Sequence, residues 1–246
     1  MNITGNIDIT RIDRRAEVIK VDTVDEVIVE YTYKLCINGS EQITLLCSPE
    51  HLDYLAIGHL ASEGWISSIE DIKSMHIDEK CGVATISLNA GSLNVGSLNA
   101  RSEYDKTLKL ESDLRVESTA ILESMKCLDD LSIAFKKTGG AHGCALFDSH
   151  GIAAFYADVG RHNAVDKIIG YALSNKIDLE DKVILTTCRI SSEIFSKAAS
   201  RRIPVIVSCS APTHLAVQTA REIGMTLIGF ARGDRMNIYS MPERVI

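Results

Sequence analysis

The sequence predicts an α/β fold, and the pattern of its second half carries this prediction. Short apolar runs at residues 183–185, 205–207 and 225–228 have the length of buried strands. Segments with apolar residues at helical spacing lie between these runs. Such alternation of strand and helix is typical of βαβ units, which place parallel strands in one sheet and helices on both of its faces.

The first half of the chain predicts a smaller α/β unit. Apolar and polar residues alternate over residues 25–47 around a turn at Asn38 and Gly39, as in a β-hairpin. Ser48 and Pro49 then predict the start of a helix, because a hydroxyl caps the first turn and proline is tolerated within it.

The end of this unit is marked by a change in composition. The helix is expected to end near Gly64, and residues 69–88 predict further strand pairing. Residues 91–100 form an imperfect repeat rich in Gly, Ser and Asn, which predicts a mobile linker or flap. We therefore expect an N-terminal unit over residues 1–112 and an α/β core over residues 113–246.

Within the core, the remaining elements follow from local signals. Residues 116–128 have helical spacing, and residues 144–147 and 152–156 predict two strands around a tight turn. Ser191 and Thr213 are placed to cap the helices that follow them.

The composition fits a globular protein and excludes several function classes. A chain of 246 residues with 46% hydrophobic and 24% charged residues can form a large core. A formal net charge of −7 argues against a general nucleic-acid binder. The first residues lack a signal-peptide pattern, and no apolar run approaches the ~20 residues that span a bilayer. We expect a cytoplasmic protein that binds neither nucleic acid nor membrane.

The seven cysteines argue against a disulfide framework and against a zinc site. Their number is odd, they are scattered, and no Cys-x-x-Cys pair is present. Most are expected to pack as small buried hydrophobes, and no metal site is predicted.

Loops at the ends of the predicted strands carry residues suited to binding a nucleotide. In sheets of this kind, ligands bind beyond the carboxyl ends of the strands. Glycine there allows close approach of the backbone, hydroxyls at helix starts donate hydrogen bonds, arginine holds phosphate, and an aromatic ring stacks on a purine or pterin. The candidate ligand-binding residues are Gly140, Asp158, Arg161, Asp166, Ser210, Thr213, Phe230, Ala231, Arg232, Gly233, Asp234 and Arg235.

One of these loops, residues 158–167, is especially dense in polar residues. It lies where a predicted strand turns into a helix, and Arg161 and Lys167 add positive charge there. A helix start with such residues favours an anionic ligand such as phosphate. The alternative is that Asp158 caps the helix and the rest is a solvated first turn.

His162 in this loop is a candidate for moving a proton or donating a hydrogen bond. Asp166 follows one helical turn later and is therefore expected to orient His162. The alternative is an ordinary surface ion pair, worth only ~0.5 kcal/mol.

These motifs together resemble the formate dehydrogenase accessory proteins, the FdhD family. The resemblance extends over most of the chain, with Thr-Gly-Gly-Ala-His, Asp-Val-Gly-Arg-His-Asn-Ala-Val-Asp-Lys, Arg-Ile-Ser-Ser-Glu, Ser-Ala-Pro-Thr and Gly-Phe-Ala-Arg in order. These motifs occupy residues 138–142, 158–167, 189–193, 210–213 and 229–232. The early helix is similar to the family's at Tyr54, Gly58, Ser62, Glu63 and Gly64.

The resemblance implies a function in sulfur transfer. Family members take sulfur from a cysteine desulfurase as a cysteine persulfide. They pass it to the molybdenum or tungsten bis-guanine-dinucleotide pterin cofactor before insertion into the catalytic subunit of formate dehydrogenase. The resemblance implies that residues 230–235 bind this cofactor, and GDP is expected to mimic part of it. It also implies a homodimer, with a core like that of cytidine deaminases: a mixed or parallel sheet with helices on both faces.

The chain departs from the family at the residue that carries sulfur. The family's Cys-Gly-Val-Cys-Gly-type loop should fall within residues 89–112, which contain no cysteine. Cys81 with the two residues after it is similar to the first half of that motif, but it lies upstream, in an expected strand. We interpret this similarity as accidental.

Two other cysteines are candidates for the missing role. Cys144 follows His142 by two residues, and Cys188 precedes Arg189. Each thiol is expected to have a lowered pKa if it lies near these groups, and each fits equally well as buried packing. The candidate catalytic residues are therefore Cys144, Cys188, His142 and His162, and whether the chain is a sulfurtransferase depends on them.

Two alternative functions belong to other classes. One is a non-catalytic chaperone that binds and delivers the cofactor without forming a persulfide, which the missing cysteine favours. The other is nucleobase deamination, which needs a zinc site and a glutamate base. His142-Gly143-Cys144 lacks that glutamate and no Cys-x-x-Cys follows, so we reject deamination.

Overall fold

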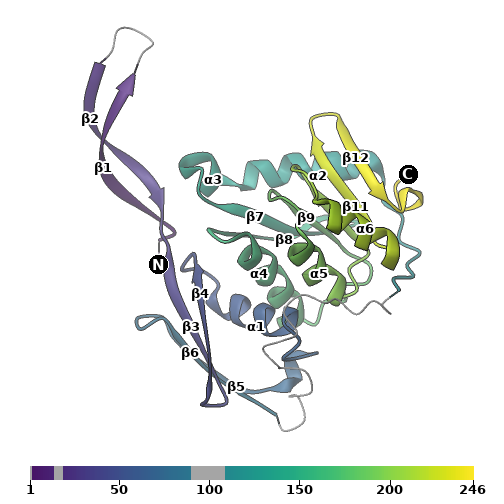
Figure 1. Ribbon diagram of the computed structural model, residues 1–246, viewed down its shortest axis with the longest axis horizontal. Coiled ribbons are helices and arrows are strands. Elements are labelled where there is room, and N and C mark those ends of the chain that lie inside the picture. Colours follow the sequence, from purple (N-terminus) through teal and green to yellow (C-terminus); the bar gives the residue numbers. More distant parts are fainter. Residues whose placement is uncertain (1, 14–18, 90–108) are drawn as a thin grey trace.

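The computed structural model describes residues 2–13, 19–89 and 109–246. Among them, the core contains a six-stranded sheet in the order β12-β11-β10-β9-β7-β8 (Figure 1). The predicted α/β fold is confirmed. The strands of this sheet are β7 (His142–Asp148), β8 (Gly151–Asp158), β9 (Val183–Thr186), β10 (Val205–Ser208), β11 (Thr226–Arg232) and β12 (Arg235–Ser240).

The parallel pairing predicted for the three apolar runs is confirmed, and the sheet as a whole is mixed. β9, β10 and β11 are parallel, whereas β7, β8 and β12 each run antiparallel to their neighbours. β7 joins β8 through the turn at Ser149 and His150, and β11 joins β12 through Gly233 and Asp234. Turns this short connect antiparallel strands, because a parallel pair needs a long crossover.

Helices cover both faces of the core sheet, as predicted. α4 (Arg161–Ser174), α5 (Ser192–Ser200) and α6 (His214–Ile223) pack on one face, while α2 (Ser118–Leu131) packs on the other. The caps predicted at Ser191 and Thr213 are confirmed, since their hydroxyl oxygens accept hydrogen bonds from Ile194 and Ala216. The short helix α3 (Ile133–Thr138) leads from α2 into β7.

The N-terminal unit contains a four-stranded sheet in the order β4-β3-β6-β5. The predicted hairpin and the later strand pairing are confirmed, and α1 packs on α4 of the core. The elements are β3 (Tyr31–Ile37), β4 (Glu41–Cys47), α1 (Leu52–Ser62), the 3-10 turn Ile69–Asp71, β5 (Ile72–Asp78) and β6 (Val83–Leu88).

The helix start predicted at Ser48 and Pro49 is wrong. α1 begins at Leu52, after His51 in a left-handed conformation with φ 53°. Ser48 instead serves the core: its hydroxyl oxygen accepts a hydrogen bond from the Val159 N–H at 3.0 Å. The Ser48 hydroxyl therefore forms a hydrogen bond with the core and does not cap α1.

A further hairpin precedes these elements and was not predicted. β1 (Thr4–Asp13) and β2 (Ile19–Ile28) pair antiparallel and extend away from the body (Figure 1). Exposed apolar side chains lie along it, among them Ile7, Ile12, Val21 and Val24.

One hydrophobic cluster runs from the N-terminal sheet through α1 into the helices α4 to α6. The unit boundary at residue 112 stays a prediction, and the predicted flap at residues 91–100 lies outside the described residues. In the part of the chain that the structure describes, we find no helix with the length and apolarity needed to cross a bilayer.

Candidate functional site

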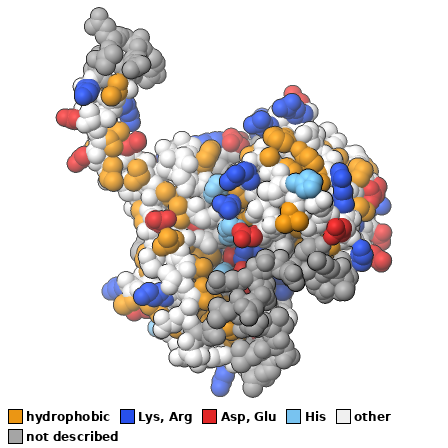
Figure 2. Space-filling view, viewed as in Figure 1, with side chains coloured by type: hydrophobic (Ala, Val, Ile, Leu, Met, Phe, Trp, Pro, Cys, Tyr) orange, Lys and Arg blue, Asp and Glu red, His pale blue; other side chains and the backbone are white. Residues whose placement is uncertain are grey.

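The strand-end loops meet along one edge of the core sheet, as the sequence predicted. Backbone hydrogen bonds join them in series, from Thr187 N to Gly143 O, from Cys209 N to Thr186 O and from Phe230 N to Ser210 O. We call this edge the rim; it comprises residues 138–143, 158–162, 186–192, 208–213 and 229–232. Figure 2 shows Lys, Arg and His side chains gathered where the core borders the N-terminal unit.

The rim is electropositive around His142. Burial lowers the pKa of His142, and the nearby cations Arg161 and Arg189 lower it further, while Asp158 opposes them. Burial is thus the main reason that His142 favours its neutral form, and the two arginines of the rim add to it. Arg161 and Arg189 are permanent positive charges, and two such charges at one edge favour an anionic ligand.

His162 lies next to these groups and contacts an acid. Its Nε2 atom is 2.9 Å from Glu193 Oε2, although the two atoms are not aligned for a hydrogen bond. Burial lowers the pKa of His162, Arg161 and Lys197 lower it further, and Glu193 opposes them. His162 is half-buried and presents a neutral imidazole at neutral pH.

Asp166 hydrogen-bonds partners other than His162 in the described structure, and its predicted ligand-binding role stays a prediction. Asp166 is buried and contacts Lys197 at 2.9 and 3.0 Å, the Ser62 hydroxyl at 2.7 Å and His59 Nδ1 at 3.3 Å. Glu63 completes this cluster through Lys197 at 3.2 Å. Asp166 therefore joins α1, α4 and α5, and its carboxylate is fully engaged beneath the rim.

Asp158 and Lys167 are also structural rather than exposed to ligand. Both are completely buried, and they form an ion pair with Nζ 2.7 Å from Oδ2. Asp158 also accepts hydrogen bonds from the backbone N–H groups of Ser48 and Gly160 and from the Asn163 amide. The positive charge expected from Lys167 is therefore paired with Asp158 away from solvent. The predicted ligand-binding role of Asp158 stays a prediction.

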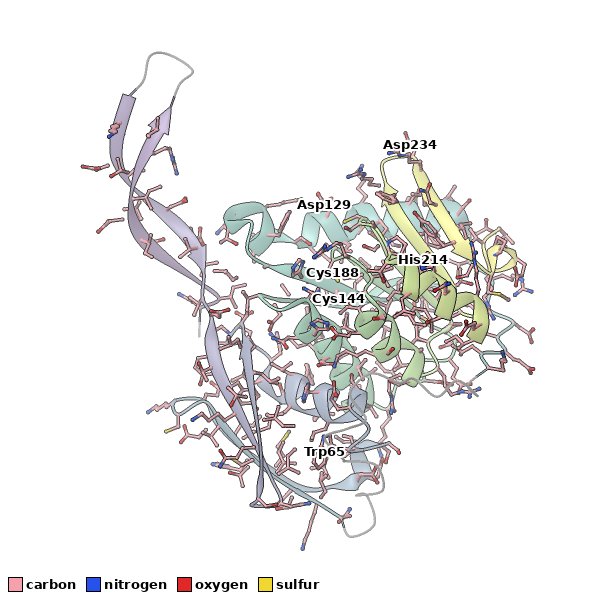
Figure 3. All side chains as sticks on the ribbon, viewed as in Figure 1. Trp65, Asp129, Cys144, Cys188, His214 and Asp234 are labelled. Atoms are coloured by element: carbon pink, nitrogen blue, oxygen red, sulfur yellow. The ribbon has the colours of Figure 1, made fainter. Side chains whose placement is uncertain are left out.

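The two predicted sulfur acceptors are buried, and the expected pKa lowering is wrong for both. Cys144 is fully buried and Cys188 nearly so (Figure 3). Burial raises the pKa of Cys144 well above its usual value and raises that of Cys188 as well, although Arg161 opposes the second. Thr186 lies between them, with its hydroxyl 3.2 Å from Cys188 Sγ.

Cys209, which the sequence analysis did not single out, is the half-buried cysteine of the rim. Burial raises its pKa and Arg232 opposes this rise. Cys81 is exposed in the turn between β5 and β6, not in a strand as expected, and a hydrogen bond with Asp78 raises its pKa. Within the described residues, no cluster of His, Cys, Asp and Glu is suited to hold a metal ion.

The segment from Phe230 to Arg235 is a β-hairpin end, not the loop that was expected. Phe230 lies in β11 with φ 53°, and Arg232 stands over its ring at 6.0 Å from the centroid. Ala231 is buried, whereas Arg232, Gly233, Asp234 and Arg235 are exposed. Figure 3 shows Asp234 at the tip of this hairpin, so Phe230 and Arg232 lie nearest the rim.

The other predicted ligand-binding residues have identifiable structural duties. The Ser210 carbonyl accepts from Phe230, and Thr213 caps α6. Gly140 leaves room for β2, since a Cβ there would lie 2.7 Å from Ile28. For Arg161 and Arg189, by contrast, the described residues provide no side-chain hydrogen bond or ion pair, so both are rim cations available to a ligand. Sequence reasoning missed Lys197 and gave no site role to His59 or to Glu193 of the Arg-Ile-Ser-Ser-Glu motif, because only packing brings these residues to α4.

Comparison with known proteins adds to this geometry. The model of the FdhD/NarQ family matches residues 28–246. The chain is 39% identical to the sulfur carrier protein FdhD of Geobacillus kaustophilus over 92% of each chain. It is 37% identical to that of Bacillus subtilis over 99% of this chain and 98% of the relative. A candidate formate dehydrogenase accessory protein from Desulfotalea psychrophila has the same fold, with a TM-score of 0.84, 23% identity and full coverage of both chains.

Proposed function

Because the chain belongs to the FdhD/NarQ family, we propose that it is a sulfur carrier that serves formate dehydrogenase maturation. In this proposal it receives sulfur from a cysteine desulfurase and passes it to the molybdenum or tungsten bis-guanine-dinucleotide pterin cofactor. A homodimer in the cytoplasm and the catalytic subunit of formate dehydrogenase belong to the same proposal. The relatives' description as sulfur carriers supports it.

The electropositive rim is the single observation that carries the cofactor part of the proposal. The bis-guanine-dinucleotide pterin bears two pyrophosphate groups, and Arg161 and Arg189 lie at the rim without a structural partner in the hydrogen bonds described. Arginine holds phosphate oxygens through a planar fork of donors. Phe230 with Arg232 adds an aromatic face at the same edge.

The sulfur step needs a cysteine that a donor protein reaches. The acceptor thiolate attacks the outer sulfur of the desulfurase persulfide, the S–S bond there breaks, and the desulfurase cysteine leaves as a thiolate. Cys144 and Cys188 are too buried for this approach, whereas Cys209 is a partly buried cysteine of the rim whose Sγ donates a hydrogen bond to the Thr187 carbonyl oxygen at 3.4 Å. Cys209 is therefore the acceptor that the geometry favours.

The test is to incubate the protein with a cysteine desulfurase and ³⁵S-cysteine and to map persulfide by peptide mass spectrometry. We expect label on Cys209 and loss of that label in Cys209→Ser. Cys127→Ser is the matched control, because Cys127 is an exposed cysteine of α2 and not a residue of the rim. Label confined to another cysteine would show that this other cysteine is the acceptor. A complete lack of label would refute the carrier function.

The alternative is a chaperone that binds the cofactor without forming a persulfide. The absence of cysteine from residues 89–112 and the raised pKa values of Cys144, Cys188 and Cys209 favour it. GDP, as a partial mimic, separates the two functions in the same preparation. Binding of GDP without any persulfide label supports the chaperone.

A further inference from the structure

Helices α4 and α5 are joined by two charged contacts, one above the other. His162 contacts Glu193 at the rim, and Asp166 contacts Lys197 one helical turn deeper. On each helix the two residues are four positions apart, which places them on one face. The polarity is reversed between the contacts, because α4 supplies the acid of the inner pair and α5 that of the outer pair.

The inner contact, between Asp166 and Lys197, is buried and has several further partners. The Asp166 and Lys197 side chains are 1% and 8% exposed, and α1 closes the cluster with His59, Ser62 and Glu63. A buried pair with this many additional partners fixes the spacing of the two helices. It therefore also fixes where His162 and Glu193 stand at the rim.

The outer contact, between His162 and Glu193, is partly exposed to solvent. The Glu193 side chain is 64% exposed and the His162 side chain is 31% exposed. His162 Nε2 itself is shielded from solvent, yet no group in the described structure forms a hydrogen bond with it. Glu193 Oε2 stands 2.9 Å away at an unfavourable angle, so it supplies charge beside the ring without satisfying the nitrogen.

The charges around His162 explain why an acid stands there. Arg161 and Lys197 are the cations that face His162, Glu193 and Asp166 are the acids, and His142 lies beyond. Because Asp166 is already paired with Lys197, Glu193 is the exposed acid that stands beside His162 and near Arg161. Its carboxylate occupies the space next to His162 Nε2, so an anion that accepts a hydrogen bond from this nitrogen has to displace it.

We propose that Glu193 is an internal competitor for the anion that binds at the rim. This inference rests on the proposed function, since it takes the rim as the site for the cofactor's phosphates. In the free protein the carboxylate sits beside His162 Nε2. When an anion binds, the exposed Glu193 side chain turns into solvent, and His162 donates its Nε2–H to the incoming oxygen. Glu193 thereby weakens the binding of small anions. A ligand that makes more contacts with the rim is affected less, because those contacts offset the cost of displacing the carboxylate.

The test is calorimetric titration of the full chain with GDP and with inorganic pyrophosphate at pH 7. Removal of the competing charge in Glu193→Gln should tighten binding of both about three- to fivefold, the range that a partly exposed ion pair supports. Glu180→Gln is the matched control, because Glu180 is 55% exposed and paired with Arg202 at 2.6 Å. It removes the same charge and should leave affinity unchanged.

A double-mutant cycle tests whether the effect of Glu193 acts through His162. In a His162→Gln background, Glu193→Gln should gain less than half as much, because the contact that it releases is already gone. An unchanged or weakened affinity in Glu193→Gln, with normal binding by the parent protein, overturns this inference alone. Failure of the parent protein to bind either probe overturns the proposed rim site as well.

Discussion

Asp166 shows at the residue scale how a buried charge depends on its neighbours. Burial by itself raises the pKa of its carboxyl, but Lys197, His59 and Ser62 outweigh burial and lower the pKa to about 2. The ordinary value is 3.8, so the folded state binds this proton less readily than the unfolded chain. Asp166 therefore stabilises the fold above pH 3.8, and this contribution is lost as the pH falls toward 2.

We expect Asp166→Asn to lower the free energy of unfolding by about 2 kcal/mol at pH 7 and to flatten its decline between pH 4 and pH 2. Urea denaturation at a series of pH values measures both effects. Asp130→Asn is the control, because Asp130 is 72% exposed and pairs only with surface Lys136. An equal acid slope in Asp166→Asn and the parent protein would refute the assignment.

At the scale of elements, the contact between α1 and α4 decides how the N-terminal unit meets the core. Gly58 of α1 and Gly170 of α4 lie where the two backbones touch. A Cβ on Gly58 would lie 1.7 Å from the Asp166 carbonyl oxygen, and one on Gly170 would lie 1.9 Å from that of Tyr54. This close approach lets Ser62 and Glu63 reach the charges of α4 and α5.

We expect Gly58→Ala to destabilise the protein by about 3 kcal/mol or more, because backbone and not a flexible side chain must move. Thermal denaturation followed by circular dichroism measures the change. Gly5→Ala is the matched control, since a Cβ there meets its nearest atom at an ordinary 3.7 Å. A melting temperature close to the parent's in Gly58→Ala would show that the helices are not in contact at this point.

At the scale of the whole molecule, the shared hydrophobic cluster makes the two units interdependent. Leu55, Leu60 and Trp65 of the N-terminal unit belong to the same cluster as Ile168 and Phe195 of the core. The buried pair Asp158–Lys167 adds to this, because Ser48 of the N-terminal unit donates its backbone N–H to Asp158. Separation of the units would expose both the apolar cluster and this ion pair.

We therefore expect the chain to unfold in a single transition. Trp65 is the only tryptophan and is 7% exposed, so its fluorescence reports on the packing of the N-terminal unit in the shared cluster. Its transition in urea should coincide with that of far-ultraviolet circular dichroism, which is dominated by the core. A separate, earlier fluorescence transition would instead support two independently folding domains divided near residue 112.

The local pattern of the sequence was sufficient to predict most helices and strands and the loops that form the rim. Apolar spacing and capping residues predicted the strands around Ile184 and Ile206 and the helix after Thr213 correctly, because these signals act within a few residues. The loops that meet at the rim also followed, since strand ends in such a sheet come together by topology.

Tertiary structure decided which of the polar residues are available for chemistry. Asp158, Asp166 and Lys167 carry charged groups, but the packing of α1 and of the segment around Ser48 buries them, and that packing comes from residues roughly 100 positions away. By itself the sequence determined the α/β elements, the electropositive strand ends and the absence of a cysteine from residues 89–112. The fold alone settled the burial and pairing of charges, because solvent exposure depends on distant segments that no local pattern contains.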